Sequence, residues 1–187
     1  MVLEHLYLTY TMTIKLNFLA LLFAISFPVV AQQLFYPLDH DENAFVETIN
    51  QIVDRSKKFE FEKIAAIESR GFVFASAVSY ILKKPFVMLR KKNKLPADVH
   101  SVDFELEYGK ATIEVHKDSI DEKDSVLVID DLVATGGTAE AAAKLIEISK
   151  GKVAAFIFVI NLFDLEGSNN LIKKNYKVEN LIDFPGH

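Results

Sequence analysis

The chain has 187 residues and a formal net charge of −5; half of its residues are hydrophobic and a quarter are charged, which is typical of one globular domain with or without a short appendage. It contains no cysteine, which excludes disulfides, thiolate metal ligands and cysteine nucleophiles. The mildly acidic balance makes nucleic acid an unfavourable partner, although a local basic cluster can still bind a small anion.

The first 36 residues differ in composition from the rest. They carry a single acid and a single base, and residues 16–31 are almost entirely apolar. This run is interrupted by Pro28 and is shorter than the roughly 20 apolar residues of a membrane span, so we expect no membrane insertion. Residues 12–31 do resemble a secretory signal. An element of the fold and a start that is not native are the other interpretations of this segment.

Residues 37–187 are predicted to form a domain in which helices and strands alternate. Helices are expected where apolar residues recur with a helical period, and strands where the apolar runs are short. In chain order we expect a helix through residues 45–53, a strand at 64–67, a helix at 72–82, a strand at 85–89, a β-hairpin at 102–115, a strand at 125–129, a helix at 139–149, a strand at 153–160, a helix at 165–174 and a strand at 181–184. This alternation predicts an α/β fold with a mainly parallel sheet flanked by helices. Ligands of such sheets bind at the carboxyl ends of strands, so the loops after residues 67, 89, 129 and 160 are the candidate site.

The segment VLVIDDLVATGGT, residues 126–138, carries the clearest functional signal. An apolar strand is expected to end in Asp130 and Asp131, and a loop of small residues leads into a helix that begins near Ala139. In the loop Ala134–Thr138, two glycines let the backbone approach an anion, and the N–H groups and the positive end of the helix face it. The carboxylates can accept hydrogen bonds from sugar hydroxyls. We therefore expect a site for a sugar phosphate, and a tight strand–helix turn without a ligand is the simpler alternative.

This segment resembles the phosphoribosyl-diphosphate signature of the type I phosphoribosyltransferases. Three further segments are similar to the adenine branch of that family: ESRGF at residues 68–72, RKKNKLP at 90–96 and LEYGK at 106–110. The resemblance runs from about Pro37 to the C-terminus. It implies a Rossmann-like, mainly parallel twisted sheet with a flexible β-hairpin lid. It also implies the reaction of adenine with 5-phosphoribosyl 1-diphosphate to give AMP and diphosphate, with Mg²⁺.

The resemblance also implies a role for individual residues. The residues implied to bind substrate are Ser69 and Arg70 at the diphosphate, Arg90, Lys91 and Lys94 on the cationic side, Asp130 and Asp131 at the ribose hydroxyls, Ala134, Thr135, Gly136, Gly137 and Thr138 at the 5-phosphate, and Leu162 at the base. The residues implied to act in catalysis are Glu107, which would move a proton near the adenine ring, Tyr108, which would close over the reaction centre, and Arg70. Mg²⁺ would be held by diphosphate oxygens, ribose oxygens and water, with no protein ligand.

Each of these assignments has a simpler alternative. Residues 83–94 contain six basic residues and no acid, and such a run is often a solvated surface. Glu107 alternates out of phase with its apolar neighbours and could face solvent on the hairpin, and Arg70 alone could be an ordinary ion-pair arginine. His100 and His116 are interpreted as loop and surface residues rather than catalysts.

The sequence departs from the family pattern in two places. Asn161 stands where the family usually has an acid, and residues 1–36 lack the N-terminal segment with an Arg–Asp pair that covers adenine and contributes to dimer contacts. The resemblance still implies a cytoplasmic homodimer whose partners are two small-molecule substrates, without nucleic acid or membrane. A phosphoribosyltransferase for another base, and a non-catalytic nucleotide sensor of the same fold, are the alternative functions.

Overall fold

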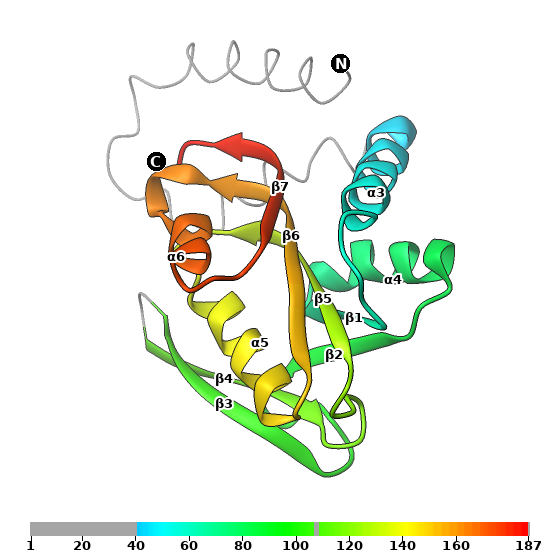
Figure 1. Ribbon diagram of the computed structural model, residues 1–187. Coiled ribbons are helices and arrows are strands. Elements are labelled where there is room, and N and C mark those ends of the chain that lie inside the picture. The colour runs from blue at the N-terminus through cyan, green and yellow to red at the C-terminus, as the bar shows by residue number, and fades with distance from the viewer. Residues whose placement is uncertain (1–40, 107–108, 187) are drawn as a thin grey trace. The chain divides into compact units, whose positions relative to one another are not determined.

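The computed structural model describes residues 41–106 and 109–186, in which helices and strands alternate along the chain (Figure 1). The helices are α3 (Glu42–Ser56), α4 (Gly71–Leu82), α5 (Gly137–Ile148) and α6 (Gly167–Lys173), with a short 3-10 helix at Phe163–Leu165. The strands are β1 (Lys63–Ile67), β2 (Phe86–Lys91), β3 (Val99–Leu106), β4 (Gly109–His116), β5 (Ser125–Val133), β6 (Lys152–Leu162) and β7 (Val178–Phe184). Every element expected from the sequence is present with the expected type. Residues 1–36, with their three interpretations, lie outside the described residues.

The chain divides after Asn50 into two units, and α3 crosses the division. At the start of α3, the carboxylate of Asp41 accepts a hydrogen bond from the N–H of Asn43 at 2.8 Å. One turn further on, the hydroxyl of Thr48 donates to the carbonyl of Ala44 at 2.8 Å. Asp41 therefore caps α3, because its short acidic side chain satisfies an N–H group that has no partner within the helix.

Residues from Gln51 onward contain a seven-stranded sheet in the order β3-β4-β2-β1-β5-β6-β7. The strands β2, β1, β5, β6 and β7 are parallel to one another, while β4 runs antiparallel to both β2 and β3. Figure 1 shows α4 and α5 on opposite sides of the parallel strands, with the β3–β4 hairpin on the side of α5. The predicted mainly parallel sheet, its flanking helices and the hairpin are all confirmed.

Both faces of the central strands are buried, as expected for parallel strands covered by helices. In β5, Val126 and Val128 join one apolar cluster with α5, while Leu127 and Ile129, which alternate with them, are also fully buried. The side chains of α5 in this cluster are Ala139, Ala141, Ala142, Ala143, Leu145 and Ile146. Because most of them are alanines, the helix backbone can approach the sheet closely.

Two boundaries near the predicted site differ from the sequence expectation. The strand expected to end at Ile129 continues to Val133, because Asp130 pairs with Phe158 and Val133 pairs with Asn161 of the neighbouring β6. The two carboxylates therefore lie inside a strand rather than after it. The following helix begins two residues earlier than expected, at Gly137.

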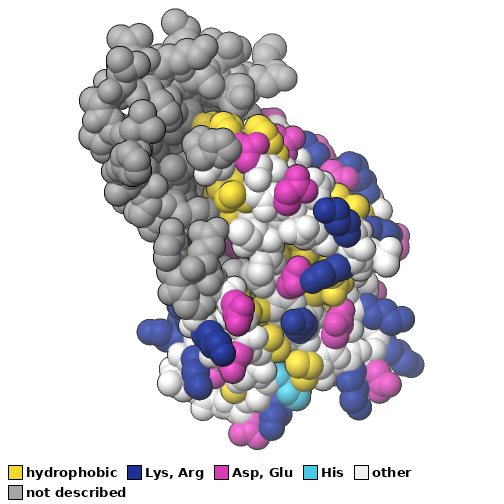
Figure 2. Space-filling model, turned by 90° about the vertical axis from the view of Figure 1, so that its left-hand side faces the viewer, with side chains coloured by type: hydrophobic (Ala, Val, Ile, Leu, Met, Phe, Trp, Pro, Cys, Tyr) yellow, Lys and Arg dark blue, Asp and Glu magenta, His cyan; other side chains and the backbone are white. Residues whose placement is uncertain are grey.

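The surface of the described residues mixes charges of both signs. On the face shown in Figure 2, Lys and Arg side chains are interspersed with Asp and Glu. Exposed apolar side chains also occur, among them Val73 and Tyr80 on α4. Within residues 41–106 and 109–186, no helix is both long and apolar enough to span a membrane.

An ion pair between Lys63 and Asp124 joins the amino ends of β1 and β5. The ammonium group lies 2.7 Å from the Asp124 carboxylate, and only 16% and 12% of these two side chains are exposed. Burial alone would raise the pKa of Asp124, but hydrogen bonds from Lys63 and from the N–H of Asp121 lower it. Burial likewise opposes the charge on Lys63, yet its hydrogen bonds to Asp124 and Asp121 raise its pKa.

This pair predicts a pH-dependent contribution to stability. A lowered carboxyl pKa stabilises the fold above the unfolded value, and this contribution disappears as the pH falls through the folded value, below about 4. The raised pKa of Lys63 stabilises the fold below about pH 10 and loses its effect as the pH rises through the folded value. We expect Asp124→Asn to lower the free energy of unfolding by about 3 kcal/mol at pH 7, because the charge on Lys63 stays buried.

Urea denaturation from pH 3 to pH 7 measures the effect, and the acid limb of the variant should be shallower than that of the wild type. Asp121→Asn is the matched control, because the Asp121 side chain is 80% exposed although it also contacts Lys63 at 3.2 Å. The control should stay within about 1 kcal/mol of the wild type. Equal losses in the two variants would contradict this account of the buried pair.

Candidate active site

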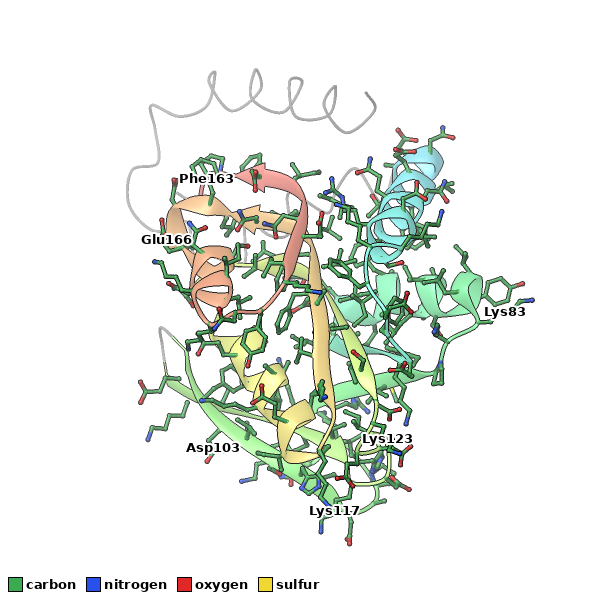
Figure 3. The ribbon with its side chains drawn as sticks, viewed as in Figure 1. Lys83, Asp103, Lys117, Lys123, Phe163 and Glu166 are labelled. Carbon is green, nitrogen blue, oxygen red and sulfur yellow. The ribbon has the colours of Figure 1, made fainter. Side chains whose placement is uncertain are left out.

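The carboxyl ends of β2, β1, β5 and β6 meet at one edge of the sheet, because these strands are parallel neighbours. The loops expected from the sequence to form the site therefore come together there. In Figure 3, Phe163 and Glu166 mark the segment that leaves β6 at this edge, while Lys117 and Lys123 lie on loops at the opposite end. The site is thus remote from the Lys63–Asp124 pair.

The loop between β5 and α5 has the geometry of an anion site. Gly136 adopts φ +91°, a conformation that favours glycine, and α5 starts at the next residue without a side-chain cap. The first N–H groups of a helix have no carbonyl partner within it, and the positive end of the helix dipole lies at the same place. The backbone of the loop Ala134–Thr138 therefore has a geometry suited to an anion, and its binding of a phosphate stays a prediction.

A glycine that the sequence did not single out supports this loop. The N–H of Gly167, the first residue of α6, donates to the carbonyl of Ala134 at 2.9 Å. A Cβ atom on Gly167 would lie 2.2 Å from that carbonyl oxygen and 2.8 Å from the backbone nitrogen of Gly136. Only glycine fits between α6 and the loop. Because Gly167 is 31 residues beyond Gly136, no local pattern in the sequence could indicate this contact.

The carboxylates of Asp130 and Asp131 are both buried, with 9% and 5% of the residues exposed. The Asp130 carboxylate accepts a hydrogen bond from the N–H of Asp131 at 2.9 Å. Burial and the negative charge of Asp131 raise the pKa of Asp130 well above its ordinary value, and Arg70 opposes this effect only in part. The site therefore holds a carboxyl group that lacks a sufficient positive partner.

The start of α4 brings Arg70 to this carboxylate pair. The Nε–H group of Arg70 donates a hydrogen bond to Asp131, whose side chain is 8% exposed. Ser69, which precedes Arg70, is exposed, and Gly71, which follows Arg70, contacts β5. A Cβ atom on Gly71 would lie 2.8 Å from the Asp130 carboxylate and 2.9 Å from the carbonyl of Ile129, so this position also requires glycine.

The basic residues predicted to lie on the cationic side share an acidic anchor. Glu68 accepts a hydrogen bond from the Arg90 guanidinium at 3.2 Å and from the N–H of Lys91 at 2.9 Å. Burial alone would raise the pKa of Glu68, but these hydrogen bonds and the nearby positive charges lower it. The Arg90 guanidinium also donates to the carbonyl of Lys94 at 3.2 Å. Glu68 thus joins the end of β1 to the segment in which the sequence placed the cationic residues.

The β-hairpin leads toward the phosphate loop. Glu107 and Tyr108, predicted to act at its tip, lie outside the described residues. Two positions earlier, the carbonyl oxygen of Glu105 lies 3.3 Å from the place that a Cβ atom on Gly137 would occupy. The end of β3 therefore adjoins the first turn of α5, which places the hairpin beside the predicted site.

A buried acid that the sequence analysis did not assign links the hairpin to the basic segment. Glu114 of β4 is 5% exposed, and its carboxylate accepts a hydrogen bond from the N–H of Asn93 at 2.9 Å. In the sheet, Glu114 is also the register partner of Arg90. A single carboxylate on a strand of mixed composition gives no signal in the sequence that would reveal this contact.

The end of β6 contributes Leu162 and Asn161. Leu162 is 1% exposed, and it pairs in register with Phe184 of β7. Asn161 is also buried, and it bonds to Asp183 and Ser168 rather than lying free at the edge of the sheet. Leu162 therefore lies at the carboxyl edge of the sheet, where ligands of parallel sheets bind.

The chain is similar in sequence to adenine phosphoribosyltransferases over most of its length. A family model described as the phosphoribosyl transferase domain matches residues 41–185. The adenine phosphoribosyltransferase of Pelagibacter ubique is 78% identical over 147 residues, which cover 79% of this chain and 84% of the relative. That of Chlorobium phaeobacteroides is 50% identical over 127 residues, covering 68% of this chain and 72% of the relative.

Solved structures show the same likeness in three dimensions. The adenine phosphoribosyltransferase of Thermoanaerobacter pseudethanolicus aligns with a TM-score of 0.75 and 41% identity over 79% of this chain and 85% of the other. The enzyme of Saccharomyces cerevisiae, solved with an imino-altritol bisphosphate and adenine, aligns with a TM-score of 0.72 and 31% identity over the same shares. The segments that form the candidate site lie within the residues matched by the family model.

The buried pair on β5 leads to a prediction about stability. Because folding raises the pKa of Asp130, stability falls as the pH rises from the unfolded value, about 3.9, toward the folded value. Asp130→Asn removes this charge and keeps an oxygen that can accept from the N–H of Asp131. We expect the variant to gain about 1 kcal/mol in free energy of unfolding at pH 7, as is common when a functional site is relieved of strain.

Urea denaturation at pH 5 and pH 7 measures this gain, which should be larger at the higher pH. Asp98→Asn makes the same chemical change where the side chain is 91% exposed, and it should leave stability unchanged at both values. A variant at position 130 that is less stable than the wild type at pH 7 would contradict the unfavourable charge.

Proposed function

Because the chain belongs to the phosphoribosyl transferase family, we propose that it transfers the phosphoribosyl group of 5-phosphoribosyl 1-diphosphate to adenine. The products are AMP and diphosphate, which makes the chain a pentosyltransferase of purine salvage. The observation that carries the proposal is the anion-binding loop that directly follows two buried carboxylates on β5. The identity to adenine phosphoribosyltransferases supports the choice of adenine as the base.

The loop and the carboxylates bind the sugar phosphate at two points. N–H groups from Ala134 to Thr138 donate to the 5-phosphate, and the hydroxyls of Thr135 and Thr138 add donors. Asp130 and Asp131 accept hydrogen bonds from the ribose hydroxyls. As the bond to diphosphate breaks, positive charge develops on the ribose ring. A carboxylate already fixed near the ring stabilises that charge without reorganising.

Substrate binding exchanges the partners of Arg70. In the structure, the Asp131 carboxylate accepts a hydrogen bond from the Arg70 guanidinium. When a ribose hydroxyl takes this place, the guanidinium can bind the diphosphate together with Ser69. Arg90, Lys91 and Lys94 add positive charge on the same side, where Glu68 already anchors Arg90. Arg70 can thus neutralise Asp131 or stabilise the leaving diphosphate.

In this proposal, Mg²⁺ would be bound through phosphoribosyl diphosphate rather than by a dedicated set of protein ligands. Among the described residues, no three His, Asp or Glu side chains converge as metal ligands, and the carboxylates nearest the ribose site are Asp130 and Asp131. These donors fit an ion held chiefly by diphosphate oxygens, ribose oxygens and water, as is common for a small, hard cation. When bound, Mg²⁺ neutralises charge on the diphosphate.

The remaining sequence expectations extend the proposal. We propose that residues 37–187 form the phosphoribosyltransferase domain, that the protein acts in the cytoplasm, and that Leu162 packs against adenine. We also propose a homodimer. Val73 and Tyr80 lie seven residues apart on one side of α4, and both are exposed, which supports an apolar contact surface there.

The reaction is tested by incubating the protein with phosphoribosyl diphosphate, Mg²⁺ and one of adenine, hypoxanthine, guanine or orotate. We expect AMP and diphosphate from adenine, and little nucleotide from the other bases, because a site built to hydrogen-bond one base rejects analogues that leave its polar groups unpaired. Product from another base alone would assign the protein to that base. Tight AMP binding without diphosphate release would instead favour a nucleotide sensor.

A second experiment tests the role of Glu107 in moving the proton of the attacking purine nitrogen. Removal of a positioned acid–base group typically lowers the rate by a factor of 10² to 10⁴. We therefore expect Glu107→Gln to lower kcat at least about 10²-fold with a much smaller change in the KM for adenine. Glu105→Gln is the matched control, because Glu105 is an exposed acid on the same hairpin. Equal kcat values for the two variants would exclude Glu107 as the proton carrier.

A further inference from the structure

Asn161 lies at the centre of a buried group of polar side chains that the proposed reaction does not use. It is the penultimate residue of β6 and is 8% exposed. Its Nδ2 donates to the carboxylate of Asp183 at 2.8 Å, and these two residues are register partners on β6 and β7. Because the carboxylate can only accept, this bond fixes the orientation of the amide and turns Oδ1 away from Asp183.

The other side of the amide holds the start of α6. The hydroxyl of Ser168, which is 5% exposed, lies 2.9 Å from Oδ1 of Asn161 and donates to it. It also lies 3.2 Å from Oδ1 of Asn180 on β7. In the segment that connects β6 to α6, Phe163 and Glu166 are exposed (Figure 3), whereas Ser168 is buried.

Ser168 is adjacent to the glycine that supports the phosphate loop. Gly167 donates its N–H to the carbonyl of Ala134 at 2.9 Å, and it has no room for a Cβ atom. The carbonyl oxygen of Gly167 lies 3.1 Å from the position that a Cβ on Gly136 would take. A displacement of Ser168 would therefore move Gly167 relative to the loop, because the backbones of Gly167 and the loop are hydrogen-bonded and closely packed.

We propose that Asn161 is a positioning residue for binding the sugar phosphate. Held by Asp183, it fixes Ser168, and Ser168 seats Gly167 against the loop Ala134–Thr138. The nature of the ligand rests on the function proposed above, whereas the positioning role rests on these contacts. An acid at position 161 would place two carboxylates side by side and would remove the N–H donor. Asn161 therefore suits Asp183, because its amide donates the hydrogen bond that the carboxylate accepts.

A reversed pair tests this inference. We expect Asn161→Asp to weaken the binding of ribose 5-phosphate about tenfold at pH 7, because the bond to Asp183 is replaced by repulsion. The double variant Asn161→Asp with Asp183→Asn restores one donor facing one carboxylate. We expect it to recover affinity to within about threefold of the wild type. Ser168→Ala, which removes only the hydroxyl, should also weaken binding by about threefold to tenfold.

Asn169→Asp is the matched control. Asn169 donates to Glu166 at 3.0 Å on the exposed side of α6, so the same substitution brings an acid beside an acid without touching the loop. We expect unchanged affinity for ribose 5-phosphate. In the wild type and all variants, isothermal titration calorimetry measures this affinity, and steady-state assays compare the KM for phosphoribosyl diphosphate with the KM for adenine. In Asn161→Asp and Ser168→Ala, only the KM for phosphoribosyl diphosphate should rise.

The outcomes separate this inference from the proposed function. If the wild type binds ribose 5-phosphate and the variants at positions 161 and 168 match it, the positioning role is wrong, even when those variants melt at lower temperature. Failure of the reversed pair to recover affinity would also overturn it. A wild type that binds no ribose 5-phosphate would refute the proposed function itself, and the positioning role with it.

Discussion

The site depends on two adjacent carboxylates held inside a strand that is buried on both faces. Water cannot stabilise them there, and their mutual repulsion raises the pKa of Asp130. Asp131 is offset by Arg70, and Gly71 leaves just enough room for the carboxylate of Asp130. Arg70 and Gly71 belong to the start of α4, so the approach of α4 to β5 both offsets the charge of the acidic pair and brings Arg70, proposed to bind diphosphate, to the proposed ribose site.

Under the proposed function, the substrate relieves the unfavourable interaction within this carboxylate pair. In the proposed reaction, ribose hydroxyls donate hydrogen bonds and the ring acquires positive charge, and both suit a buried carboxylate pair. Binding in the proposed reaction would therefore be most favourable at Asp130, the carboxylate whose charge is least favourable in the structure. Arg70 contacts Asp131 in the structure and is proposed to bind the diphosphate once a ribose hydroxyl takes its place. A carboxylate pair already neutralised by protein groups would stabilise the positive charge of the transition state less strongly.

Most of the fold and part of the site could be predicted from the sequence, because their signals are local. Apolar runs such as residues 64–67 and 153–160 mark buried strands, and the glycines after Asp131 mark the anion loop. The end of β5 was predicted four residues too early, since polar Asp130 and Asp131 masked the continuing pairing with β6. The contacts of Glu114, Asn161 and Gly167 could not be predicted, because their partners are distant in sequence and depend on strand order. The resemblance supplied roles for residues that composition alone would leave as surface charges.

The loop Ala134–Thr138 is thus determined by more than its own glycines. On one side it continues into α5, whose first turn adjoins the carbonyl of Glu105 at the end of β3. On the other side it contacts Gly167, which depends on Ser168 and the amide of Asn161. The end of β3 in the hairpin and the end of β6 therefore both adjoin the backbone that is proposed to bind phosphate. If the loop binds phosphate as proposed, the binding would affect both the hairpin and the end of β6, because both pack closely against the loop.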